Sequence, residues 1–348
     1  MKKKILIIVI ILAVLICGCI AYMVVGGRPV ESGNNEEQYI NIDQGSSSEQ
    51  IADKLEDAGL IRSALVFRIK AKMGGDDSKF QAGTYALTKG MTANRIIWLI
   101  ANGKTAGKSF HVLDRESSDK IAQTLSENDI CTEKEFFSEC GNGSFDYPFM
   151  DILPDGENRF EGFLWPDTYM VSLKAGAHEA IDKMLAGFNE NVYQKYKDDI
   201  EKKGLNFYDV IIKASVIEGE ASDPEDMEKV SSVIDNRIKN GMLLQMDSTL
   251  NYIKKEEKVI SSLSDTKLES KYNTYKHKGL PPGPICSPGE NAIKAAIYPA
   301  DTDYLFFVNS DKLDGTLTFS KTEAEHYKAQ KKFEDAYSEY TKKNNEDQ

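Results

Sequence analysis

The sequence has few of the residues that cross-link proteins through disulfides or metals. Its 348 residues include five cysteines and four histidines. Cys17 and Cys19 lie in an apolar N-terminal run, which leaves an odd number of cysteines elsewhere and argues against a disulfide framework. A single Cys131–Cys140 bridge stays open. The histidines are scattered without the spacing of metal ligands, so the sequence predicts no metal site and no other cofactor.

Positive charge is also scarce. Asp and Glu number 55 against 43 Lys and Arg, which gives a formal net charge of −12. Removing the three lysines at the N-terminus makes the remainder more acidic still. Because an acidic chain is repelled by a phosphate backbone, we exclude nucleic acid as an expected partner.

No charged residue occurs between Ile5 and Val25, a length that can cross a bilayer as one helix. The lysines at positions 2–4 place residues 1–4 in the cytoplasm and the rest of the chain outside, by the positive-inside rule. A cleaved signal peptide is the alternative, but its apolar core is usually shorter and a small-x-small site follows it. The glycine-rich, polar residues 26–38 are expected to form a flexible stalk.

Residues 39–107 predict a small module of mixed structure. Ser47 and Thr92 each lie two residues after a glycine and before apolar residues at helical spacing. This pattern is expected where a side-chain oxygen caps the start of a helix. The order is strand, helix, helix, strand, which resembles a LysM-like module, a fold often used to hold glycan chains. Glycan binding and a role as a rigid spacer both stay open for it. Its expected elements are strands 39–42 and 82–87 and helices 48–57 and 63–72.

The predicted fold class is α+β, with a transmembrane helix at 5–25, the module, and a mixed α+β domain over 108–341. Aromatic residues gather at 160–169, where both sugar stacking and core packing are possible. The charged stretch 254–271 predicts a solvated, mobile insert. Expected helices cover 175–197, 205–221, a segment opening at Pro224, 290–298 and 321–340; a hairpin joins 304–308 to 316–319, and 342–348 form a polar tail.

Glu218 interrupts an apolar helical run. Ile211, Ala214 and Glu218 share one face at spacings of three, four and seven, so Glu218 points toward a core. Burial disfavours the charged carboxylate and raises its pKa, as a general acid requires. The alternative is a buried structural acid paired with a cation, and Arg237 near the end of the next helix is one candidate. Glu220 lies about 200° around the helix, so the two carboxylates are not expected to form a catalytic pair.

Several motifs follow in a fixed order. Residues 279–289 read GLPPGPICSPG, a proline-rich loop with little conformational freedom left to lose on binding. The complete series is ASVIEGEA, the pair Asn236-Arg237, QMDSTLNY, YNTY, GLPPGPICSPG, AAIYPA and YLFFV. This series resembles the catalytic region of the MltG (YceG-like) family of endolytic murein transglycosylases, and the upstream anchor and module match that family's layout.

The resemblance implies a lytic transglycosylase in the bacterial cell membrane, single-pass, with its catalytic domain outside the cytoplasm. It implies cleavage of nascent peptidoglycan between N-acetylmuramic acid and N-acetylglucosamine, which leaves 1,6-anhydro ends, with Glu218 as the catalytic acid and then base. Peptidoglycan synthases and division proteins are the candidate protein partners. The residues it implies for substrate binding are Asp247, Thr249, Asn273, Tyr275, Gly279, Leu280, Pro281 and Glu220.

One motif departs from the family's pattern. Gln245-Met246-Asp247-Ser248 stands where the family has a threonine after the glutamine and a proline after the aspartate.

Two other functions are compatible with the sequence. A glycoside hydrolase needs a second carboxylate, at about 5–5.5 Å in a retaining enzyme or about 6.5–9.5 Å in an inverting one, for which Asp247, Glu220 and Glu161 are candidates. A wall-binding scaffold needs no catalytic residue.

Overall fold

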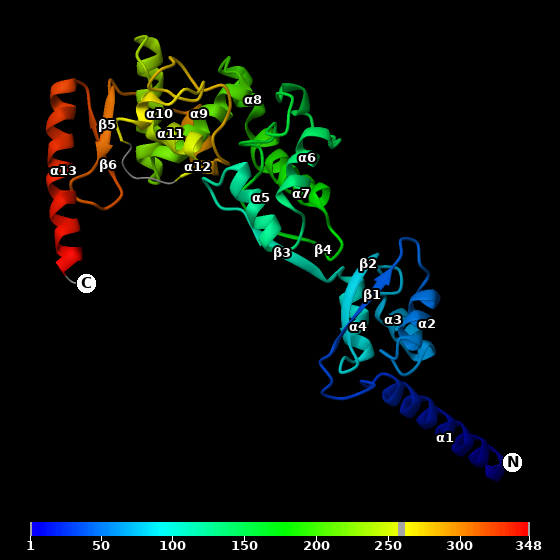
Figure 1. Ribbon diagram of the computed structural model, residues 1–348. Coiled ribbons are helices and arrows are strands. Elements are labelled where there is room, and N and C mark those ends of the chain that lie inside the picture. Colours follow the sequence, from blue (N-terminus) through cyan, green and yellow to red (C-terminus); the bar gives the residue numbers. More distant parts are fainter. Residues whose placement is uncertain (1, 257–261, 347–348) are drawn as a thin grey trace. The chain divides into compact units, whose positions relative to one another are not determined.

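The computed structural model of the protein describes residues 2–256 and 262–346, in a mixed α+β arrangement (Figure 1). The chain divides into two compact units. Unit 1 comprises residues 1–108 with 170–174, and unit 2 comprises residues 109–169 with 175–348. The mixed α+β class expected from the sequence is confirmed.

The chain begins with helix α1, Lys2–Gly26, whose side chains are largely exposed along its apolar length. Within the described residues it is the one helix long and apolar enough to cross a membrane. A membrane anchor and a signal sequence both have these properties.

The rest of unit 1 forms the predicted strand, helix, helix, strand arrangement, followed by one more helix. Strands β1 and β2 pair antiparallel, with Tyr39 opposite Ala86. Ser47 caps α2 through a complete capping box with Gln50, as its spacing predicts. Apolar side chains from both strands and all three helices share one core. The elements are β1 Glu37–Ile42, α2 Ser48–Asp57, α3 Ala64–Gly74, β2 Gly83–Thr88 and α4 Ala93–Ala101.

The segment expected to be a flexible stalk instead lies against this module. Arg62 donates to the carbonyl oxygens of Pro29 and Val30, at 2.9 and 2.8 Å. The amide of Glu31 donates to the Lys89 carbonyl at 3.1 Å, and their side chains form an ion pair. Strand β1 also starts inside the expected stalk. The glycine and polar composition of the segment does not encode these long-range hydrogen bonds, which is why its sequence suggested flexibility.

Unit 2 is mainly helical. Strands β3, Gly107–His111, and β4, Thr168–Ser172, each include residues of both units. Thr132 and Glu135 cap α6 through a capping box, and Asp223 caps α10. Between the two strands lie α5 Ser118–Glu127, α6 Glu133–Asn142 and the 3-10 turn Met150–Ile152; the later helices are α7 Ala177–Phe188, the π-helical segment Asn189–Tyr193, α8 Gln194–Lys202, α9 Phe207–Glu220, α10 Pro224–Lys239, α11 Asp247–Lys254, the 3-10 turn Asp265–Lys267, and α12 Glu290–Ile297.

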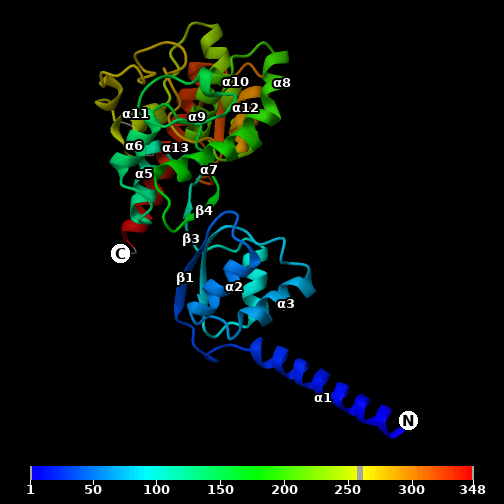
Figure 2. The ribbon, with the colours of Figure 1, turned by 90° about the vertical axis from the view of Figure 1, so that its right-hand side faces the viewer.

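Helix α9 is the centre of this unit. It packs against α10, α11 and α12, and every residue from Val210 to Glu218 is buried. Both ribbon views show α9 among these helices (Figures 1 and 2). A helix that is apolar on all sides is stable only when neighbours cover it completely.

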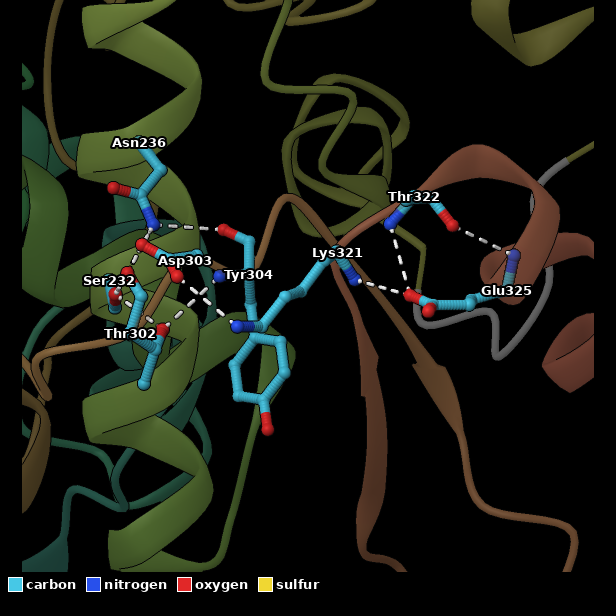
Figure 3. Close-up of polar contacts among 8 residues, drawn as sticks. All are labelled: Ser232, Asn236, Thr302, Asp303, Tyr304, Lys321, Thr322 and Glu325. Atoms are coloured by element: carbon cyan, nitrogen blue, oxygen red, sulfur yellow. Dashed lines mark hydrogen bonds and ion pairs between the residues drawn. The ribbon is translucent and has the colours of Figure 1, made fainter.

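The C-terminal part is a hairpin followed by a long helix. Strands β5, Phe306–Asn309, and β6, Leu317–Ser320, pair antiparallel, and α13 spans Glu323–Glu346. Figure 3 shows how α10 holds the chain before the hairpin: the Asn236 amide donates to the carbonyls of Thr302 and Tyr304, at 2.8 and 2.9 Å. Glu325 accepts from the backbone amides at the start of α13.

Several local expectations differ from the structure. The helix expected over 175–197 contains a π-helical segment and continues to residue 202. The expected polar tail, 342–348, is helical as far as Glu346. In the expected mobile insert, residues 257–261 lie outside the described part, whereas Asp265 is buried and paired with Lys254 at 2.9 Å. All five cysteines are free.

The aromatic cluster at 160–169 packs in the core. Phe160 and Phe163 are fully buried, and Tyr169 donates to the Trp165 carbonyl at 2.6 Å. Core packing is therefore the possibility observed for Phe160, Phe163 and Tyr169, because all three side chains are buried.

Candidate active site

Glu218 lies near the C-terminal end of α9 and is 7% exposed. Ile211 and Ala214, which share its face, are fully buried, so the predicted inward orientation is confirmed. The backbone amide of Gly289, just before α12, donates to Glu218 Oε2 at 3.0 Å. The carboxyl group is therefore largely removed from solvent and accepts a hydrogen bond from one backbone amide.

These surroundings raise the pKa of Glu218 to about 7, and burial is the largest cause. The Gly289 amide acts against this shift because it stabilises the carboxylate. The nearby charge of Asp114 raises the pKa further, whereas that of Arg115 lowers it. Near neutral pH the group is therefore divided between acid and carboxylate, as a residue that first gives and later takes a proton requires.

Arg115 is the cation of this site. Its Nε and Nη2 both donate to the backbone oxygen of Glu218, at 2.9 and 2.6 Å, and its own amide donates to the Ser287 carbonyl at 2.9 Å. Carbonyls in the last turn of a helix lack partners within the helix, so this contact caps α9. Arg115 adopts a φ of 73°, an uncommon conformation for a non-glycine residue that turns it toward α9.

The cation suggested by the sequence, Arg237, does not occupy this position. Its guanidinium donates to the carbonyls of Leu305 and Leu244, both at 2.6 Å, and holds the strand end near the hairpin. The suggestion that Arg237 pairs with Glu218 is wrong because α10 turns this side chain toward β5.

Glu218 opens onto a pocket of about 360 Å³. Its lining is mostly polar and comes from three chain segments: the loop before α5, the chain from the end of α9 into the first turn of α10, and the start of α12. Sequence reasoning missed every other residue of this lining, because only the fold brings the segments together. The residues around Glu218 are Asp114, Arg115, Ser222, Met227, Gly289, Glu290 and Asn291.

Glu220 and Asp247 lie at the end of α9 and the start of α11. The Ser248 amide donates to Glu220 Oε1 at 2.9 Å, and burial raises the pKa of Glu220. Tyr275 donates its hydroxyl proton to Asp247 Oδ1 at 2.5 Å. Gly219 lets the start of α11 lie close to α9, since a Cβ on Gly219 would be 2.5 Å from the Ser248 Cβ. The structure thus brings three of the predicted binding residues to the same end of α9.

The other predicted binding residues are more enclosed. Thr249 and Asn273 are fully buried: the Thr249 hydroxyl donates to the Met246 carbonyl at 2.7 Å, and the Asn273 amide donates to the Leu268 carbonyl at 2.8 Å. Gly279 and Leu280 are half-buried and Pro281 is buried. In this structure the side chains of Thr249 and Asn273 fix their loops and do not face solvent.

Glu161, a candidate second carboxylate, lies in a different environment. It accepts from the Ser118 amide at 3.0 Å and from the Tyr252 hydroxyl at 3.3 Å, and burial raises its pKa to about 8. Tyr252 and Tyr272 also line a second pocket, of about 640 Å³. Glu161 does not line the Glu218 pocket, whereas Asp114 and Glu290 do, and the sequence named neither of them as a candidate second carboxylate.

Residues 2–256 and 262–346 contain no group of three or more His, Cys, Asp or Glu side chains arranged to hold a metal ion. The raised pKa of Glu218 and the Gly289 amide beside it provide for proton transfer and hydrogen bonding at this site.

Comparison with known proteins gives consistent matches along most of the chain. The model of the YceG-like family matches residues 40–332. An endolytic murein transglycosylase of Bacillus subtilis is 33% identical over 318 residues, which cover 88% of this chain and 87% of that protein. An endolytic murein transglycosylase of Streptococcus pneumoniae is 28% identical over 325 residues, and the match covers 86% of this chain but 58% of that longer protein.

A solved structure agrees with these matches. The crystal structure of a YceG-like protein from Listeria monocytogenes is 30% identical and superimposes with a TM-score of 0.58, covering 84% of this chain and 99% of that one. With the family model, the relative in Bacillus subtilis and this fold in agreement, the chain belongs to the YceG-like family.

Proposed function

We propose that this protein is a membrane-anchored lytic transglycosylase that cuts within peptidoglycan strands, between N-acetylmuramic acid and N-acetylglucosamine. The observation that carries the proposal is Glu218: an acid near the end of a buried helix, with a pKa raised to about 7, that opens onto a polar pocket. The names of the relatives in Bacillus subtilis and Streptococcus pneumoniae support the substrate class.

The proposed reaction uses one carboxyl group twice. Protonated Glu218 gives its proton to the glycosidic oxygen while the bond from C1 of N-acetylmuramic acid to that oxygen breaks. The Glu218 carboxylate then takes the proton of the 6-hydroxyl of the same sugar, whose oxygen bonds to C1 and closes the 1,6-anhydro ring. The proton returns to Glu218 and no water is consumed, so no second catalytic carboxylate is required.

Two groups keep Glu218 ready for both steps. The Gly289 amide donates to one carboxylate oxygen and orients the side chain. Arg115 holds the backbone oxygen of the same residue and places a positive charge near the carboxyl group. Burial alone would favour the neutral acid so strongly that giving the proton to the glycosidic oxygen would become difficult, and these two groups limit the rise in pKa.

We propose that Asp247, Tyr275 and Glu220 contact the glycan, together with the backbone of Gly279, Leu280 and Pro281. Asp247 and Tyr275 are each only partly buried and hydrogen-bonded to one another, so they present a fixed polar pair at the end of α9. Thr249 and Asn273 then contribute by holding the loops on which this pair lies, rather than by direct contact.

We further propose that α1 anchors the enzyme in the cell membrane, with residues 2–4 on the cytoplasmic side, and that residues 39–107 form a LysM-like module. The length and apolar composition of α1 support anchoring. The strand, helix, helix, strand order around one core supports the module. Glycan binding by this module is a separate question from catalysis.

The test is the product spectrum of Glu218→Gln. Purified full-length protein is incubated with uncrosslinked glycan strands, and the products are analysed by mass spectrometry. We expect the wild type to form anhydro ends, one water lighter than reducing ends, and Glu218→Gln to form none while keeping its fold and its binding to strands. Reducing ends from the wild type would indicate a hydrolase, and unchanged cleavage by Glu218→Gln would refute the assignment.

A further inference from the structure

Helix α3 carries a row of exposed apolar side chains. Leu65, Ile69 and Met73 are 54%, 37% and 79% exposed, respectively, and they follow one another at intervals of four residues. Single exposed hydrophobic residues are ordinary, but residues at this spacing form one continuous stripe on a helix. The stripe has no partner among the described residues that would explain its composition.

The stripe lies on the side of α3 that faces away from the module's core. Ala64, Phe67 and Ala71 are the core-facing residues of this helix. At about 100° per residue, the centre of the Leu65, Ile69 and Met73 stripe is about 170° from the centre of that core face. Helix α3 is therefore apolar on two opposite sides, which is typical of a helix held between a protein core and a second apolar phase.

The C-terminal end of α1 packs directly beside this stripe. The Tyr22 and Ser63 hydroxyls are 3.1 Å apart. Gly26 lies so close to Val66 that a Cβ on Gly26 would be 2.7 Å from the Val66 Cγ2, and a Cβ on Gly27 would lie even closer to the Lys70 Cε. Both helices belong to unit 1, and Figure 2 shows α1 leaving the module beside α3. The exposed stripe thus begins at the level where the long apolar helix ends.

We propose that α3 lies in the interface of the membrane that α1 spans, with Leu65, Ile69 and Met73 inserted among the lipid acyl chains. This rests on the anchoring role proposed for α1 and is independent of the chemistry at Glu218. Lipid is the occupant that the position favours, because α1 brings the bilayer to α3 in every molecule. The position of α1 does not bring a partner protein or a second copy of the chain to α3 in the same way.

The polar residues around the stripe fit a lipid surface. Lys72 is exposed and follows Ile69 of the stripe by three residues, which makes the two neighbours on the helix surface, and Lys70 lies on the side toward α1. Lysines beside an apolar stripe extend their ammonium groups to the headgroups while their carbon chains cover apolar surface. Membrane contacts at both α1 and α3 would fix the orientation of the module relative to the bilayer, which a single spanning helix does not fix.

The test places a fluorescent reporter on the stripe. Full-length Met73→Trp is reconstituted into vesicles of phosphatidylglycerol and phosphatidylethanolamine, with or without lipids brominated on the acyl chain. The emission added by the new tryptophan is obtained by subtracting the wild-type spectrum, which contains the two native tryptophans. Tyr39→Trp is the matched control, because Tyr39 is 55% exposed on the opposite side of the same core, on the outer face of the β1–β2 sheet.

We expect the emission added by Met73→Trp to shift to shorter wavelength and to lose most of its intensity to bromines placed ~5–10 Å below the headgroups, the depth of interfacial helices. Tyr39→Trp should give water-exposed emission that brominated lipid does not quench. Equal, unquenched emission from both variants would overturn the proposal. A shift to shorter wavelength without quenching would overturn it in favour of a protein occupant. Failure of the wild type to float with the vesicles would refute the anchor itself and, with it, this proposal, whereas loss of glycan cleavage alone would leave both intact.

Discussion

The acid form of Glu218 should control the pH dependence of cleavage. The structure raises the pKa of this group from 4.5 to about 7. Because one pKa unit corresponds to about 1.4 kcal/mol, the surroundings disfavour the carboxylate by about 3 kcal/mol. An acid with the ordinary pKa would be protonated in roughly one molecule in 300 at pH 7, whereas here about half of the molecules hold the proton.

The assay is the initial rate of anhydro-end formation from uncrosslinked glycan strands between pH 4.5 and 9. kcat/KM reports groups of the free enzyme, so it should fall about tenfold per pH unit above pH 7. Two charge variants test the cause. Asp114→Asn removes a negative neighbour and should move the falling limb to lower pH, and Arg115→Gln removes a positive one and should move it to higher pH. A falling limb near pH 4 to 5, or a limb that neither variant moves, would refute this account of the site.

Two further predictions concern stability. The pKa of Glu218 is higher in the folded protein than in the unfolded chain, so this group leaves stability unchanged below about pH 4, lowers it progressively up to about pH 7, and lowers it by a constant amount above that. Glu218→Gln should therefore match the wild type in urea unfolding at pH 4 and be more stable by up to about 3 kcal/mol at pH 8. A gain that is equal at both pH values would contradict the assigned ionisation. Gly162→Ala should destabilise by more than about 1 kcal/mol, because φ is 82° and the new Cβ would lie 2.5 Å from a proline ring. Gly204→Ala is the control, because Gly204 has a φ of 68° but no atom within 4 Å of the new Cβ. In thermal unfolding it should lose less stability than Gly162→Ala; equal losses would show that backbone strain alone is responsible.

Much of the local structure followed from the sequence because its causes are local. Ser47 and Thr132 cap helices through the spacing that their sequences show, and Asp223 with the following proline begins α10. The apolar spacing around Ile211 placed Glu218 on the buried face of α9, as observed. In each case the deciding contacts lie within one or two helical turns, so the sequence alone contains them.

The surroundings of Glu218 required the fold. Arg115 is 103 residues away along the chain and Gly289 is 71 residues away, yet both bond to this one residue. The sequence pointed to Arg237 as the cation, but the direction in which α10 turns that side chain depends on where the C-terminal hairpin docks. Thr249 and Asn273 likewise matched expected motifs, and only the packed loops show that their side chains are enclosed.

The sequence by itself determined the apolar N-terminal helix, the order of elements in the module and the burial of one acid in a helix. Periodicity and capping set these features, and both act over a few residues. Tertiary structure alone decided which charges surround that acid, that the expected stalk lies against its module, and that the outer stripe of α3 begins beside the end of α1. These features depend on contacts between distant segments, whose positions are fixed only when the whole core has packed.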